Sequence, residues 1–163
     1  MKNHPRLTRA RLRELLHYDK DTGELRWLER IGSEFRPGVV AGNVHIRVQG
    51  RNYSAHQLAW FYMTGRWGRP MIDHRDGNST NNRWSNLRLA TASQNNANRR
   101  RSLDNTAGYK GVSLVPNSRR RWRAVIHKNR RRIHLGTFAT PEAAHAAYVT
   151  AARKVHGKFA RAK

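Results

Sequence analysis

The sequence contains no cysteine among its 163 residues, which excludes disulfide bonds and zinc sites built on thiolates. It also lacks an apolar run of the roughly 18 residues that a membrane-spanning helix needs. Charges are scattered through the N-terminal segment, which has no uninterrupted apolar core and does not resemble a secretory signal. These absences favour a reducing interior, and we expect the protein in the cytoplasm.

Acidic residues are scarce too, with 10 Asp and Glu against 33 Lys and Arg, a formal net charge of +23. Such a surface repels itself, so the partner that we expect is a polyanion such as nucleic acid. Residues 1–98 hold 16 basic and 8 acidic side chains, whereas residues 99–163 hold 17 and 2. A basic membrane-binding protein would carry an amphipathic helix with bulky apolar residues, but the best helix here has an alanine face. We therefore expect no membrane partner.

Short helices and strands alternate in the N-terminal half, which predicts an α+β fold. The patterns predict a helix over 8–18 and short strand hairpins between residues 19 and 53. A buried helix should follow from His56 and end at Gly65.

The stretch from 71 to 98 is unusual because Asp73 and His74 are followed by seven asparagines, at positions 78, 81, 82, 86, 95, 96 and 98. Asparagine favours turns, so turn chemistry is one interpretation and a set of ligands is the other. We assign four side chains of the loop to turns and caps: Asp76, Asn78, Asn81 and Asn82. Asn82 is also a candidate to brace the loop.

Asp73 and His74 suit the hydrolysis of a phosphodiester. This reaction needs a base that activates water and a cation that stabilises charge on the phosphate and on the leaving oxygen. His74 offers an imidazole, Asp73 a carboxylate, and Asn86 and Asn95 amide oxygens that a returning loop and helix can bring to the same place. Mg²⁺ takes oxygen ligands and keeps several waters, so two protein oxygens suffice.

These residues resemble the HNH family of nucleases and its ββα-metal motif, in the branch of phage and intron-homing enzymes. The similarity covers residues 53–98. Its motifs are His56-Gln-Leu-Ala, Asp73-His74-Arg-Asp76-Gly77, Asn82, Asn86-Leu87-Arg88 and Gln94-Asn95-Asn96-Ala-Asn98.

The resemblance implies that His74 is the general base and that Asp73 and Asn95 hold a divalent metal, Mg²⁺ before Mn²⁺. It implies that Asn86 belongs to the catalytic set by positioning the His74 loop through hydrogen bonds. Asn96 is a rival to Asn95, because the doubled asparagine leaves the register open by one residue. His56 matches a recurrent family position, where a structural role is favoured.

The C-terminal half predicts three strands, at 109–115, 121–129 and 131–138, followed by an alanine-rich helix from Pro141 to Gly157. Over residues 108–160 this half resembles an AP2-type DNA-binding domain, which lays a three-stranded antiparallel sheet into the major groove. The runs that carry the resemblance are "GYKGVS", "RRWRAVIHK" and "RRIHLGTFATPEAAHAAYVTAARKVHGKFA".

The resemblance implies a set of groove-facing residues, and the other basic residues of this half suit contacts with phosphates. The groove-facing set is Lys110, Ser113, Trp122, His127, Arg132 and His134, with a place in the core as the alternative for Trp122. The set expected to contact phosphates is Arg119, Arg120, Arg121, Arg123, Lys128, Arg130 and Arg131.

We therefore expect an HNH nuclease domain at 1–98, a basic linker at 99–107 and an AP2-like domain at 108–163. The expected function is a divalent-metal-dependent endonuclease of the phage or homing type, which nicks double-stranded DNA as a monomer without an obligate protein partner. Two other classes stay open: a DNA-binding regulator with an inactive nuclease fold, and an RNA-binding or nucleoid protein.

Overall fold

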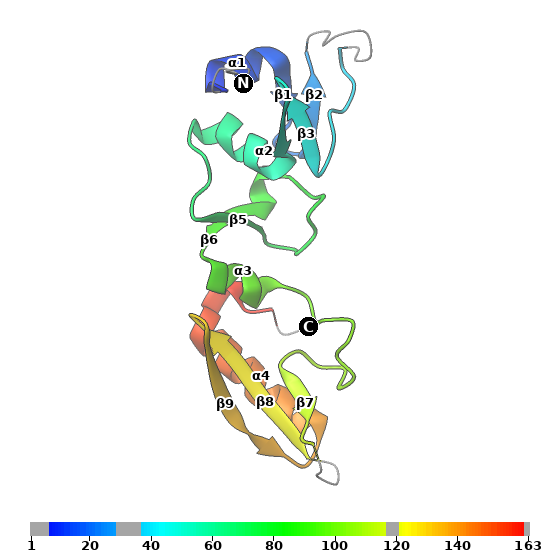
Figure 1. The fold of residues 1–163 in the computed structure, drawn as a ribbon, viewed down its shortest axis with the longest axis vertical. Helices are drawn as coiled ribbons and strands as arrows, with labels where there is room; N and C mark the ends of the chain where they lie inside the picture. Colours follow the sequence, from blue (N-terminus) through cyan, green and yellow to red (C-terminus); the bar gives the residue numbers. More distant parts are fainter. Residues whose placement is uncertain (1–6, 29–36, 117–120, 162–163) are drawn as a thin grey trace. The chain divides into compact units, whose positions relative to one another are not determined.

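The computed structural model describes residues 7–28, 37–116 and 121–161. The chain divides into two compact units, residues 1–89 and residues 90–163 (Figure 1). Both combine helices with small sheets, which confirms the α+β class. None of the helices in the described part of the chain is long and apolar enough to cross a membrane.

The first unit begins with α1 (Arg9–Leu15), where the Thr8 hydroxyl caps the helix by accepting from the Arg11 backbone N–H at 3.1 Å. The predicted helix over 8–18 is too long, because the chain continues as β1 (Leu16–Tyr18). β1 pairs with β2 (Leu25–Trp27), which places Leu16 opposite Trp27 and Tyr18 opposite Leu25. These four apolar side chains are buried, and their pairing ends the helix early.

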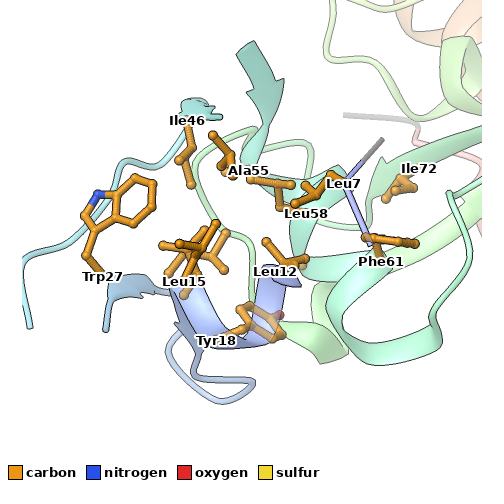
Figure 2. Packing of buried hydrophobic residues seen from close by; sticks show 14 of the residues in the cluster. Leu7, Leu12, Leu15, Tyr18, Trp27, Ile46, Ala55, Leu58, Phe61 and Ile72 are labelled. Atoms are coloured by element: carbon orange, nitrogen blue, oxygen red, sulfur yellow. The ribbon is translucent and has the colours of Figure 1, made fainter. Parts of the chain in front are cut away.

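A second hairpin, β3 (His45–Val48) and β4 (Arg51–Ser54), leads directly into α2 (Ala55–Thr64). This confirms the predicted buried helix, which ends at Gly65 with a left-handed φ of 71°. The core between these elements is shown in Figure 2. Its buried members include Leu12, Leu15, Leu16, Leu25, Trp27, Ile46, Val48, Leu58 and Phe61.

β5 (Met71–His74), a short 3-10 helix η1 (Trp84–Asn86) and β6 (Leu87–Ala90) follow. β5 and β6 form their own two-stranded sheet. The next helix, α3 (Ala92–Asn98), belongs to the second unit.

The second unit contains an antiparallel sheet in the order β7 (Val112–Leu114), β8 (Trp122–Lys128) and β9 (Arg131–Phe138). One face of the sheet is covered by α4 (Pro141–His156), and η2 (Gly157–Phe159) follows (Figure 1). This confirms the predicted sheet and helix. The small side chains of Ala144 and Ala152 let α4 approach the sheet closely.

The segment predicted as a linker, 99–107, lies within the second unit. Ala107 is buried in the core of this unit, and the Asn105 amide donates to the backbone carbonyls of Tyr109 and Val112. Arg101 donates in turn to the Asn105 carbonyl at 2.9 Å. The two compact units meet in sequence after Leu89.

Candidate active site

Asp73 and His74 are the last two residues of β5, and both side chains are buried. The loop that follows returns to the same place, because the Arg75 backbone N–H donates to the Asn86 carbonyl at 2.8 Å. This loop carries most of the asparagines that distinguish the sequence.

Asp76 holds the loop together. Its carboxylate accepts from the Asn78 backbone N–H at 2.8 Å and from the side-chain amides of Asn81 and Asn86 at 2.7 and 3.0 Å. Burial opposes ionisation of this carboxyl, but these hydrogen bonds prevail and lower the pKa of Asp76. The charged carboxylate therefore acts as a fixed acceptor for the surrounding N–H groups.

Asn86 is buried and uses both ends of its amide within the loop. Its Oδ1 accepts from the Asp76 backbone N–H at 3.0 Å, and its Nδ2 donates to the Asn81 carbonyl at 2.7 Å as well as to Asp76. These bonds fix the turn immediately after His74.

Asn82 contacts His74 directly. Its Oδ1 lies 3.0 Å from His74 Nε2, and its Nδ2 donates to the Asn43 carbonyl at 2.8 Å. Asn82 is only 2% exposed, and its own carbonyl accepts from the Tyr18 hydroxyl at 2.6 Å. An asparagine at this position would suit a turn equally well. The sequence therefore identified Asn82 as a candidate brace of the loop, but it did not identify His74 as the partner of Asn82.

His56, on α2, is a second imidazole beside His74. The two ring centroids lie 5.2 Å apart and the planes are nearly perpendicular, at 77°. Burial, then repulsion by His74 and His45, lowers the pKa of His56 to about 4. His56 is therefore neutral near pH 7, and a proton taken up by His74 does not face a second charge there.

Asp73 pairs with Arg88 on β6, with Oδ2 and Nε 2.8 Å apart and both side chains buried. Arg88 belongs to the Asn86-Leu87-Arg88 motif, but its side chain was not among the predicted site residues. The guanidinium compensates a carboxylate that would otherwise be costly to bury.

Asn95 and Asn96 follow each other on α3, where Asn95 is half-buried and Asn96 is exposed. A capping box begins this helix: Thr91 Oγ1 accepts from the Gln94 backbone N–H, and Gln94 Oε1 accepts from the Thr91 backbone N–H. The described residues contain no group of three or more His, Cys, Asp or Glu placed to hold a metal. The buried Asp73 carboxylate and an asparagine amide are hard oxygen donors, which fits a cation of the Mg²⁺ type.

In the second unit, the register of the sheet decides which side chains face away from α4. Ser113 pairs with Arg123 and Arg123 with Thr137, while His134 lies opposite Val125 and Arg132 opposite His127. Paired residues point to the same side of a sheet. The opposite side, which carries Val112, Ala124 and Ile126, packs against α4. We call the first side the open face; its polar members are Ser113, Arg123, His127, Arg132, His134 and Thr137.

Two members of the predicted groove-facing set lie elsewhere. Trp122 is partly buried on the α4 side and packs against the cluster of Val112 and Ala144. The Lys110 ammonium donates to the carbonyls of Ala97 and Arg99, at 2.5 and 2.6 Å. Burial, then the charges of Arg161 and Arg99, lowers the pKa of Lys110 to about 8.

Arg123, predicted as a phosphate contact, is on the open face, where its Nη2 lies 3.4 Å from Ser113 Oγ. Four other members of the predicted phosphate set have exposed side chains: Arg121, Lys128, Arg130 and Arg131. Arg119 and Arg120 lie outside the described residues.

A family model described as HNH endonuclease matches residues 53–97. The chain is also 36% identical to Protein 3.8 of Escherichia phage T7 over 90 residues, which cover 55% of this chain and 73% of that protein. No solved structure matches the chain.

Proposed function

The chain belongs to the HNH endonuclease family, and from this premise we propose that it hydrolyses phosphodiesters of double-stranded DNA with a divalent metal. The observation that carries the proposal is the environment of His74. This imidazole ends β5, is held by Asn82, and lies beside a second histidine that is neutral near pH 7.

His74 is the general base of the proposed reaction. It accepts a proton from a water molecule, whose oxygen attacks the phosphorus while the bond from phosphorus to the 3′ oxygen breaks. The leaving 3′ oxygen takes up a proton from solvent water, so the products are a 5′ phosphate and a 3′ hydroxyl. Asp73, together with Asn95 by the family pattern, would hold a divalent cation that stabilises charge on the phosphate and on the leaving oxygen.

The second unit binds DNA through its sheet in this proposal. A sheet of this size enters the major groove, where side chains of one face reach base edges. Ser113, Arg123, His127, Arg132 and His134 lie on the open face and suit this task. The exposed arginines and lysine around the sheet supply phosphate contacts, which add affinity without sequence information.

We further propose a phage or homing type of enzyme that works in the cytoplasm of a bacterial or phage-infected cell. The relative in phage T7 supports this class. Because each chain carries one base and one proposed metal site, a monomer should nick one strand faster than it breaks both.

A supercoiled-plasmid assay tests the proposal with wild type, His74→Ala and the surface control His17→Ala, each with Mg²⁺, Mn²⁺ or EDTA. Wild type and His17→Ala should produce open circles with metal only, whereas His74→Ala should bind DNA in a gel shift without cutting it. Linear DNA that forms faster than open circles would refute nicking by a monomer. Binding without cutting by wild type under every metal would leave a DNA-binding protein with an inactive nuclease fold.

A further inference from the structure

The contact between Asn82 and His74 decides which imidazole nitrogen is the base. Nε2 of His74 lies 3.0 Å from Oδ1 of Asn82, and both side chains are buried. A neutral imidazole carries its hydrogen on one nitrogen and a basic lone pair on the other. The hydrogen on Nε2 would leave the lone pair on Nδ1, and the reverse holds for the other tautomer.

The orientation of the Asn82 amide is fixed by Asn43. The Asn43 backbone carbonyl can only accept, and Nδ2 of Asn82 lies 2.8 Å from it. A flipped amide would place two acceptor oxygens against each other there. Oδ1 therefore faces His74, where it can only accept, and Nε2 must be the nitrogen that donates.

Asn82 cannot easily move away from this position. Its backbone carbonyl accepts from the Tyr18 hydroxyl at 2.6 Å. Gly23 approaches its backbone so closely that a Cβ there would lie 2.5 Å from the Asn82 carbonyl carbon. A 2% exposed side chain also leaves little access for water to replace Oδ1.

We propose that Asn82 is a positioning residue for the nuclease reaction. It holds His74 as the tautomer with its hydrogen on Nε2, so that Nδ1 takes the proton from the attacking water. The inference rests on the proposed function, since it assumes that His74 is the base. After proton transfer both nitrogens carry hydrogens, and the Nε2–H to Oδ1 bond remains as a stronger, charge-assisted bond. The site therefore needs no rearrangement between the two protonation states of His74.

Nitrogen NMR on the full chain with labelled histidine tests the tautomer directly, because protonated and unprotonated ring nitrogens differ widely in chemical shift. At a pH where His74 is neutral, wild type should show a protonated Nε2 and an unprotonated Nδ1. Asn82→Leu has a similar size but no acceptor, and should show a mixture of both tautomers. Asn82→Asp keeps an oxygen against Nε2 and should restore the wild-type pattern.

Kinetics supply the second readout. Asn82→Leu should slow single-turnover cleavage on the order of tenfold, the cost typical of groups that orient a site residue, with DNA affinity unchanged. Asn52→Leu makes the same change at an exposed position of β4 and should leave both the tautomer and the rate as in wild type.

A hydrogen on Nδ1 in wild type, or an unchanged tautomer in Asn82→Leu, would overturn the assignment. If Asn82→Leu fails to fold, the wild-type spectrum alone decides. These spectra need neither metal nor DNA, so they test Asn82 separately from the nuclease proposal, which fails if wild type never cuts DNA.

Discussion

The Asp73 carboxylate and the Arg88 guanidinium form a buried ion pair that joins the ends of β5 and β6, with 2.8 Å between Oδ2 and Nε. Both charged groups are buried and have lost most of their hydration, so each needs the opposite charge beside it to offset the free-energy cost of leaving water. The carboxylate that we propose as a metal ligand is thus also part of the structural link between two strands.

We expect Arg88→Met to lower the free energy of unfolding by about 3 kcal/mol, because it leaves the Asp73 charge buried without its guanidinium. Urea denaturation measures this loss. Adding Asp73→Asn to Arg88→Met removes the unpaired charge and should restore part of the lost stability. The double variant should therefore lose less free energy of unfolding than the sum of the losses in the two single variants. The exposed Arg83→Met is the control, and an equal effect of both arginine variants would contradict the prediction.

The sequence predicted the elements of this fold well where apolar side chains alternate or a helix carries its own caps. The run at His45–Val48 and the cap at Thr140 are examples, since both signals are local. The sequence predicted less of the site, because an asparagine that forms a turn and a buried asparagine that holds a site residue both act through amide hydrogen bonds and look alike in the sequence. Only the path of the chain, which brings Asn43 and Tyr18 to Asn82, distinguishes them.

Which side chains lie on the open face of the second unit was also difficult to predict from the sequence. The pairing of β8 and β9 shifts register at Ala124 and Val125, which breaks the simple alternation along the sheet. Trp122 was expected in the groove or in the core by motif position, and Arg123 was expected to contact phosphates. The structure places Arg123 on the open face and Trp122 against the cluster beside α4, and neither position is signalled by composition alone.

Gly23 should tolerate no side chain. Its φ is +80°, and a Cβ would lie 2.4 Å from the Arg83 backbone nitrogen and 2.5 Å from the Asn82 carbonyl carbon. Gly23→Ala should therefore lower the free energy of unfolding and slow cleavage, since relief of the collision displaces Asn82. Gly38 is a matched control, with φ of +86° but nothing within 4 Å of its Cβ. If Gly38→Ala has equally large effects, backbone strain rather than the collision is responsible.

His56 should make the first unit sensitive to acid. Its pKa is about 4 in the folded chain, against an ordinary value of 6.5, owing to burial and to the nearby His74 and His45. Between pH 6.5 and 4 the unfolded chain binds more protons, so the free energy of unfolding falls as the pH falls, by up to about 3 kcal/mol. Urea denaturation across this range should show a shallower pH dependence in His56→Gln. The exposed His17→Gln should keep the wild-type slope, and equal slopes in wild type and His56→Gln would refute the prediction.

Lys110 should hold the end of α3, the helix that carries Asn95. Its ammonium donates to the carbonyls of Ala97 and Arg99, groups that a helix end leaves without partners in the helix. Lys110→Met should lower the local opening free energy of this turn by about 1 kcal/mol and speed amide hydrogen exchange there roughly fivefold. Lys154→Met removes the same charge from an exposed position on α4. Unchanged exchange in α3 of Lys110→Met would show that the two bonds do not stabilise the helix.

Arg123 and Trp122 are neighbours on β8, but only substitution of Arg123 should change DNA binding. Arg123 lies on the open face beside Ser113, so Arg123→Ala should weaken binding by about 1–3 kcal/mol if it reads a base. Loss of a phosphate contact would instead make the salt dependence of binding shallower by about one unit in the log–log slope. Trp122→Leu keeps an apolar side chain against Val112 and Ala144, so it should lower the thermal stability with DNA affinity unchanged. Titrations of labelled DNA at several salt concentrations separate these outcomes. A loss of affinity in Trp122→Leu as large as that in Arg123→Ala would mean that DNA does not bind to the open face.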